Sequence, residues 1–324
     1  MKNYKIILKS NSAITQLPDS QKVFGALITA FAEANGNDKT SELVKAVIDK
    51  KIHLALSNVN PLDYFPMPQD YVVDRLAKMV TVGESLKKKR AAVKERAYVR
   101  LEDLKCVLEN PGIAETIYPY IKQADDQQLR ASMDSVMYGI QGLETKLYTV
   151  PTLRLSERTW TEGRETDQSV SQFCFYLQMD ESELGAAIRD LVEELMKSGT
   201  SLILGKRASQ GLNTYRVTTV KEIELPNEKH YLNLGMLLPN KIDFSTSVLK
   251  LFTSERRPFV MQGGWDRRCT KYFISFVAAG SIISLQDGVE QAGKCVPSPF
   301  NKSRDIVFGN AFLYPISLEK GGAE

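Results

Sequence analysis

Apolar residues near the start of the chain repeat first at the spacing of a strand and then at that of a helix. Residues 4–9 form an apolar run in which alternate side chains share one face, and this predicts a strand. Apolar positions then recur three and four residues apart between Ser20, a residue type that caps helices, and Asn35-Gly36, a pair that ends them. We therefore expect a strand and then a helix capped by Ser20.

Helical spacing also dominates the following hundred residues. Residues 38–60 continue a helical pattern, and residues 70–148 have helical periodicity. The proline-rich segment 65–68 separates these stretches, and its apolar side chains indicate a segment that docks on the core, since they would be costly to leave in water. The clearest apolar face of the second stretch consists of Leu101, Leu104, Val107 and Leu108.

The pattern changes to alternation after residue 148. Residues 150–172 alternate polar and apolar side chains on both sides of Glu162-Gly163, which predicts a hairpin with a long polar tip. Arg158 and Trp160 fall near this tip. Large aromatic side chains normally bury their surface, so either Trp160 folds back on its own domain or it contacts a partner.

A strand, a helix and two further strands complete this half of the chain. The helix is expected to begin at Asp180, with Glu183 completing a capping box, and to end at Gly199. The strands are expected at residues 173–178, 201–204 and 214–220. Without the inserted residues, the order of elements is close to βαββαβ, the ferredoxin-like arrangement.

A shift in composition at Pro226 indicates a domain boundary. The residues after it are rich in predicted strands and poor in helical patterns, so the fold class is α+β. Two sheet domains in tandem fit a chain of 324 residues. We therefore divide the chain into residues 1–225, with a helical insert at about 60–148, and residues 226–324.

Composition limits the ways in which this chain could bind a partner. Hydrophobic residues make up 43% and charged residues 25% of the chain, as in globular proteins. With 42 basic and 39 acidic residues the net charge is +3, which excludes a polybasic protein. Binding to nucleic acid would therefore depend on local clusters of cations.

Cysteine use and hydropathy indicate the cellular compartment. The four cysteines lack CxxC spacing, so they form neither a zinc pattern nor a disulfide framework, and a reducing compartment is expected. Cys106 and Cys174 lie among apolar residues and are expected to be buried. No signal peptide or long apolar span is apparent, so we expect a cytoplasmic protein without membrane contact.

Catalytic chemistry is hard to assemble from these residues. His53 and His230 are the only histidines, and no P-loop, GxSxG or HExxH motif occurs. Carboxylates are numerous but scattered, so they indicate no metal site. We therefore expect no enzyme activity, no catalytic residue, no metal and no cofactor.

Two glycine-bounded basic loops favour binding of a phosphate backbone. A residue without Cβ allows the backbone to approach a ligand closely, and cations beside it suit an anion. The first loop offers Lys206, Arg207, Ser209, Gln210 and Gly211, and the second, at 263–271, offers Trp265, Arg267, Arg268 and Lys271. The alternatives are a solvated hairpin turn and a surface loop. Taken with the Trp160 hairpin, the two loops favour RNA binding by stacking and backbone contacts.

A third basic cluster lies within the insert, at Lys87–Arg90, and it is followed by Lys94, Arg96 and Arg100. Clustered cations release counterions when they meet a nucleic-acid backbone, so this run could contact phosphates. It could equally be the solvated face of a helix or a contact for protein, and the sequence leaves these alternatives open.

Several motifs, in order along nearly the whole chain, resemble the RAMP proteins of CRISPR effector complexes. More narrowly, the chain resembles the fourth subunit of type III-A (Csm) complexes, which binds the 5′ tag of the guide RNA. The motifs are QKVFGALITAF at 21–31, FPMP at 65–68, KKKR to VLEN at 87–110, VPTLRLSERTW at 150–160, LGKRASQG at 204–211, FVAAGSIISL at 276–285 and FGNAFLYPISLE at 308–319.

This resemblance implies two ferredoxin-like (RRM-like) modules, the first with a β-hairpin thumb, here the hairpin at about 150–172. It implies a subunit without nuclease activity that grips the repeat-derived tag, contacts target RNA only indirectly, and docks on the large Cas10-type subunit and a backbone RAMP subunit. The implied RNA contacts are Lys22 at a helix start, Lys206 to Gly211, the second-domain loop with Arg267, Arg268 and Lys271, and Arg154, Arg158 and Trp160 of the thumb.

Two other functions remain open at this point. One is a RAMP endoribonuclease that processes precursor guide RNA, and the other is a scaffold that makes no RNA contact. The scarcity of histidines argues against the first, because RNA cleavage usually needs an acid/base pair.

Overall fold

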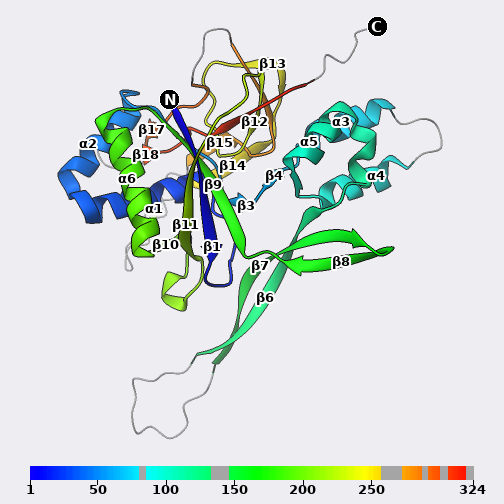
Figure 1. The fold of residues 1–324 in the computed structure, drawn as a ribbon, viewed down its shortest axis with the longest axis horizontal. Helices are drawn as coiled ribbons and strands as arrows, with labels where there is room; N and C mark the ends of the chain where they lie inside the picture. The colour runs from blue at the N-terminus through cyan, green and yellow to red at the C-terminus, as the bar shows by residue number, and fades with distance from the viewer. Residues whose placement is uncertain (80–84, 133–145, 257–271, 287–290, 300–305, 319–324) are drawn as a thin grey trace, which may run out of the picture.

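The computed structural model describes residues 1–79, 85–132, 146–256, 272–286, 291–299 and 306–318. Helices and antiparallel sheets are mixed in this part of the chain (Figure 1). The described residues contain six α-helices, all of them before residue 200. No helix among the described residues is both long and apolar enough to cross a membrane.

The first sheet has the strand order β10-β11-β1-β9-β2, with β3 also paired to β9. Helices α1 and α6 pack on one face of this sheet, and α2 packs beside α1 (Figure 1). The elements are β1 (Lys2–Ser10), α1 (Ser20–Asn35), α2 (Asn37–Ile48), β2 (Leu54–Leu56), β3 (Asn60–Pro61), β9 (Gln172–Met179), α6 (Glu183–Ser198), β10 (Ser201–Ile203) and β11 (Thr214–Ile223).

Strand β1 forms the centre of this sheet and pairs antiparallel with both β9 and β11. Its alternate residues Tyr4, Ile6 and Leu8 are buried against the helices. Because side chains alternate across a strand, Lys5 and Lys9 point to the opposite face. We call that opposite face of β1 and β11 the outer face.

The helix boundaries were predicted well, but the two capping residues were not. Asp19, not Ser20, caps α1, and its carboxylate accepts a 2.9 Å hydrogen bond from the backbone N–H of Lys22. Ser20 is fully buried, and its hydroxyl accepts a 3.0 Å bond from the Met236 N–H. Likewise Ser182 caps α6, whereas Asp180 accepts the Ser182 hydroxyl proton and so holds the cap in place. The expected ends at Gly36 and Gly199 are confirmed.

The inserted residues build a second sheet with the order β4-β5-β6-β7-β8 and three helices beside it. Phe65 and Met67 are buried, which confirms the docking role predicted for segment 65–68. The elements are β4 (Tyr64–Pro66), α3 (Gln69–Met79), α4 (Leu86–Glu95), β5 (Tyr98–Arg100), α5 (Leu101–Glu109), the 3₁₀ turn η1 (Pro111–Glu115), β6 (Tyr120–Ser132), β7 (Lys146–Thr161) and β8 (Arg164–Ser169).

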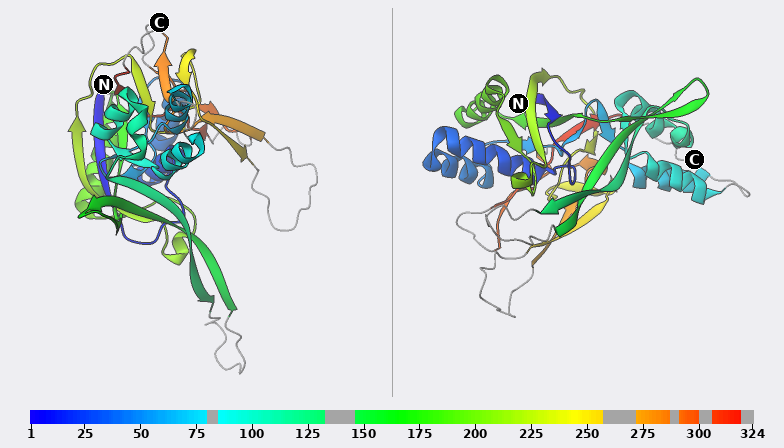
Figure 2. Two further views of the ribbon diagram at one scale, coloured as in Figure 1. Left: turned by 90° about the vertical axis from the view of Figure 1, so that its right-hand side faces the viewer. Right: turned by 90° about the horizontal axis from the view of Figure 1, so that it is seen from below.

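Strand β7 pairs with both β6 and β8, which gives two hairpins that share it. We call β6 with β7 the arm, and β7 with β8 the side hairpin; they point in different directions (Figure 2). The side hairpin turns at Glu162-Gly163, as predicted. The arm was missed, because helix was expected over residues 70–148. The expected helix over 38–60 also ends early, at Ile48. Cys106 is exposed, whereas burial was expected.

The remaining described residues form strands around a third sheet, ordered β13-β16-β12-β19. Two short hairpins, β14–β15 and β17–β18, accompany it. This part of the chain packs closely on the helices of the first sheet, since Phe308 stacks on Phe24 of α1 with ring centroids 4.4 Å apart. The strands are β12 (His230–Asn233), β13 (Ile242–Val248), β14 (Leu251–Arg256), β15 (Tyr272–Val277), β16 (Ile282–Leu285), β17 (Val296–Pro297), β18 (Ile306–Val307) and β19 (Leu313–Ile316).

Candidate nucleic-acid interface

The loop between β10 and β11 exposes cations on a rigid frame. Leu204 and Leu212 are each only 1% exposed and anchor the two ends of the loop in the core. Between them, the side chains of Lys206 and Arg207 are exposed. Arg207 and Gly211 both have left-handed backbone conformations, with φ of 66° and 71°, on either side of a short 3₁₀ turn. We call residues 205–213 the glycine loop.

Asn213 holds the glycine loop in this shape from beneath. It is fully buried, and its side-chain amide donates to the Lys206 carbonyl over 2.7 Å. Its oxygen accepts a 2.8 Å bond from the backbone N–H of Thr15. A Cβ on Gly205 would lie 2.9 Å from the Asn213 side chain, so glycine is needed there for the close approach. Neither Asn213 nor Thr15 was predicted from the sequence to support this loop.

The arm lies against the same loop. Arg130 of β6 donates from Nη1 to the backbone carbonyl of Gln210 over 2.9 Å. Farther along the arm, the backbone N–H of Leu153 donates to the Ile14 carbonyl over 2.8 Å. The segment that carries Ile14 and Thr15 therefore joins the glycine loop to the arm.

Lys22 lies in the first turn of α1, seven residues after Thr15 in the chain. Its ammonium group forms a 2.5 Å ion pair with the capping residue Asp19. Both side chains are about one-third exposed. A phosphate at this helix start would therefore compete with Asp19 for Lys22, although the first-turn N–H groups and the helix dipole also favour an anion there.

Arg158 and Trp160 lie at the other end of β7, on the side hairpin. Arg130 pairs with Tyr148 near the start of β7, and Trp160 lies twelve positions farther along the same strand. At about 3.3 Å per residue this is roughly 40 Å. The structure therefore does not bring Trp160 together with the glycine loop.

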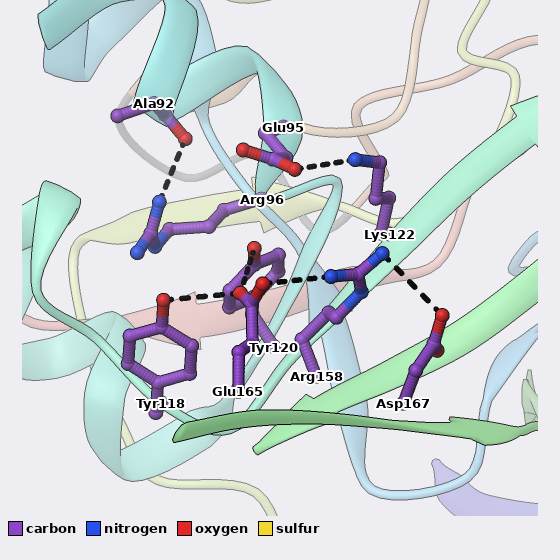
Figure 3. A network of polar contacts seen from close by, with 9 residues as sticks. All are labelled: Ala92, Glu95, Arg96, Tyr118, Tyr120, Lys122, Arg158, Glu165 and Asp167. Carbon is purple, nitrogen blue, oxygen red and sulfur yellow. Dashed lines mark hydrogen bonds and ion pairs between the residues drawn. The ribbon is translucent and has the colours of Figure 1, made fainter. Parts of the chain in front are cut away.

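The side hairpin has its own network of charges and rings (Figure 3). Arg158 forms ion pairs with Glu165 at 2.7 Å and Asp167 at 3.3 Å. The hydroxyl groups of Tyr118 and Tyr120 both donate to Glu165. Partial burial by itself would raise the pKa of the Glu165 carboxyl. The hydrogen bond from Tyr118 and the charge of Arg158 outweigh this effect and lower the pKa of that carboxyl. The guanidinium of Arg158 is thus already bound by two carboxylates.

Trp160 is held on this network yet remains 58% exposed. Its ring lies 5.8 Å from that of Tyr118, tilted by 49°. Arg96 is buried beneath Tyr118 and Tyr120, with its guanidinium carbon 4.4 Å from the Tyr120 ring centre. The network therefore presents an exposed aromatic ring on a fixed support.

Comparisons with known proteins bear on the fold. No protein-family model matches the chain, and no curated protein matches it. Among solved structures, the Csm4 chain of a Csm1–Csm4 cassette in complex with pppApA is 16% identical, with a TM-score of 0.55 over 99% of this chain and 100% of that one. The Csm4 chain of the cassette in complex with cA4 is 15% identical to this chain, with a TM-score of 0.54 over 98% of this chain and 100% of that one.

The chain has the Csm4 fold. This likeness confirms, at the level of the fold, the resemblance that the sequence motifs indicated. At 15 to 16% identity, the property that these chains share is the fold.

Within the Csm4 fold, the predicted contacts divide into three groups. The first group comprises Lys22 in the first turn of α1, Arg154, which is exposed about halfway along β7, and the residues of the glycine loop, Lys206, Arg207, Ser209, Gln210 and Gly211. Arg158 and Trp160 lie at the end of the side hairpin. The remaining residues, Trp265, Arg267, Arg268 and Lys271, lie outside the described part of the chain.

The basic run of the insert has been divided by the fold. Lys87, Lys88 and Arg90 are exposed on α4, whose one buried residue is Val93. Arg96 is instead a buried structural residue that donates to three backbone carbonyls, and Arg100 forms an ion pair with Glu157 at 3.3 Å. The phosphate-contacting face considered from sequence therefore does not extend to Arg96.

Both histidines lie away from the glycine loop and contact polar side chains. His53 Nε2 is 2.8 Å from Gln178 Oε1, and His230 Nδ1 is 2.9 Å from Ser284 Oγ. Among the residues that the structure describes, no group of three histidine, cysteine or acidic side chains could hold a metal ion. The glycine loop itself presents exposed cations, at Lys206 and Arg207.

Proposed function

We propose that this protein is a non-catalytic RNA-binding subunit of a type III-A CRISPR interference complex, which grips the repeat-derived 5′ tag of the guide RNA. The observation that carries the proposal is the contact of the arm with the glycine loop through Arg130 and Gln210. This contact fixes two exposed cations, Lys206 and Arg207, beside a long projecting hairpin. The Csm4 fold supports the same role by resemblance.

The chemistry of the glycine loop suits a phosphate backbone more than a base. Lysine and arginine side chains and backbone N–H groups contact phosphates without reading sequence. A subunit of this kind fixes one end of the guide, and base pairing then reads the target, as in other RNA-guided systems. The fixed tag would set the position from which the other subunits count.

We assign the separation of tag from guide to the thumb region, which we predicted at about 150–172 and which here includes two hairpins. The arm is the one that touches the glycine loop, through Arg130. We therefore propose that the arm borders the tag and that the side hairpin acts farther along the guide.

The two-module architecture is also a proposal. The order β11-β1-β9-β2, with α1 after β1 and α6 after β9, is that of a βαββαβ unit and supports a ferredoxin-like first module within residues 1–225. For residues 226–324 we propose a second such module. The described residues there form strands only, so this proposal rests on the resemblance.

We further propose that the protein anchors a large Cas10-type subunit to a backbone RAMP subunit in the cytoplasm. The solved chains of similar fold were crystallised with Csm1, which supports a partner of that class. The alternative function, an endoribonuclease for precursor guide RNA, would need an acid/base pair. Replacing His53 and His230 together with alanine should leave any RNA processing by the purified chain unchanged, and loss of cleavage would favour the alternative.

The decisive experiment is to purify the full chain with the other subunits and sequence the bound RNA. A guide-binding subunit should carry RNAs that share a constant 5′ end. The variant Lys206→Ala with Arg207→Ala should carry less of this RNA. Bound RNAs without a common 5′ end, in equal amount for both proteins, would contradict the proposal.

A further inference from the structure

The outer face of the first sheet carries cations in facing pairs. Lys9 of β1 lies directly opposite Arg216 of β11, and Lys5 lies opposite Lys221. Residues directly opposite in an antiparallel pair have side chains on the same face, and like charges there are destabilising. The two pairs are four residues apart along β1, or about 13 Å.

Acidic partners compensate only one of these four charges in the described part of the chain. Lys5 forms a 2.5 Å ion pair with Asp63. Lys9, Arg216 and Lys221 are exposed, and none of them forms an ion pair with a described residue. The fold therefore retains like charges on this face that no acidic side chain among the described residues offsets, apart from Asp63 at Lys5.

These cations continue from the glycine loop. Thr214, the first residue of β11, follows directly after that loop, and Arg216 is two residues farther along the strand. Figure 1 shows the ends of β10 and β11 meeting the loop beside the lower end of β1. Lys206 and Arg207, then Lys9 with Arg216, and then Lys221 form a line, which we call the cationic track.

We infer that the cationic track binds the phosphate backbone of single-stranded RNA that leaves the glycine loop. This inference rests on the proposed RNA-binding function and extends the binding site along the outer face of β1 and β11. A line of unpaired cations that continues from a basic loop suits a linear polyanion, because each neutralised phosphate releases counterions.

Acidic side chains surround the end of the cationic track that lies farthest from the glycine loop. Lys5 and Lys221 line a groove of ≈ 950 Å³ that also contains Asp63, Glu102 and Glu157. These carboxylates would repel a phosphate. We therefore assign the phosphate contacts to Lys9 and Arg216, and we expect them to end where Lys221 enters the groove.

Substituting Arg216 could also affect the stability of α6. The guanidinium lies about 3 Å from where a side chain on Gly199 would begin, at the C-terminal end of α6. A cation at that end of a helix stabilises it through the dipole. Lys9→Gln alone is therefore the cleaner variant, and its melting temperature should not fall, because it removes a like-charge contact.

The test measures binding of the full chain to a fluorescein-labelled, unstructured RNA long enough to cover the glycine loop and the sheet face, over a series of salt concentrations. The log–log slope should flatten by about 0.7 for Lys9→Gln and by about 1.4 for Lys9→Gln with Arg216→Gln. The matched control, Lys39→Gln with Lys45→Gln, removes two exposed charges from α2 behind the sheet and should not change the slope.

Three results would overturn the inference. Equal flattening by the α2 control would mean a general effect of net charge. If both track variants bind RNA like the wild type while Lys206→Ala with Arg207→Ala weakens binding, the proposed function stands and the track serves another partner, such as an acidic protein surface. If the wild-type chain binds no RNA, the proposed function fails as well.

Discussion

Arg130 and Gln210 are joined by a 2.9 Å hydrogen bond although eighty residues separate them in the chain. The first belongs to the projecting arm and the second to the glycine loop. The bond is between a guanidinium and a backbone carbonyl, so it fixes the loop backbone and occupies neither the Lys206 nor the Arg207 side chain. Arg207 itself donates to the exposed Gln210 side-chain oxygen over 3.2 Å. The Arg130 bond ties the element that could border a tag to the element that could grip it.

Removing this bond should loosen the arm from the loop. For Arg130→Ala we expect a loss of about 1 kcal/mol in RNA binding, or roughly fivefold in affinity, because the loop must then be ordered by the ligand. Hydrogen exchange at the loop amides should also quicken. Lys39→Ala, on α2 behind the sheet, is the control and should affect neither measurement. Unchanged exchange in Arg130→Ala would show that the loop is held by Asn213 alone.

The loop cations should determine how strongly salt weakens RNA binding. For single-stranded RNA, each lost phosphate contact flattens the log–log salt slope by about 0.7, so Lys206→Ala with Arg207→Ala should flatten it by about 1.4. The same change made at Lys39 and Lys45 of α2 serves as the control. A slope equal to that of the wild type would remove the glycine loop from the RNA interface.

Asn213 should be worth more to stability than its place in a surface loop suggests. It is buried, has a left-handed φ of 58°, and bonds to both Thr15 and Lys206. We expect Asn213→Ala to lower the free energy of unfolding by about 2–3 kcal/mol, from lost hydrogen bonds and a strained backbone. Asn213→Gly should cost about 1 kcal/mol less, since glycine accepts that φ. Urea midpoints measure both, and equal midpoints would show that backbone strain plays no part.

Local signals explain why much of the fold could be predicted from the sequence. The spacing of apolar residues and the glycines at 36 and 199 placed α1 and α6 to within a few residues. The turn at Glu162-Gly163 placed the side hairpin in the same way. These features depend on neighbours in the chain, so they can be read without knowledge of tertiary contacts.

The arm and the loop support were missed because their determinants are not local. Most of β6 is exposed on both faces, so its sequence ADDQQLR shows no alternation of polar and apolar residues. Asn213 and Thr15 are almost two hundred residues apart, and nothing in either segment indicates the contact. The facing pairs Lys9–Arg216 and Lys5–Lys221 likewise become visible only through the register of β1 with β11.

Trp160 should affect the position of the guide and not the strength with which the tag is held. It lies roughly 40 Å along β7 from the arm residues that meet the glycine loop. The side hairpin should stay folded in Trp160→Ala, because Arg158, Glu165 and Asp167 do not depend on the indole. We therefore expect unchanged affinity for a tag-length RNA and shifted target cleavage positions in the assembled complex. Cleavage at unshifted positions would mean that Trp160 serves only to pack against Tyr118.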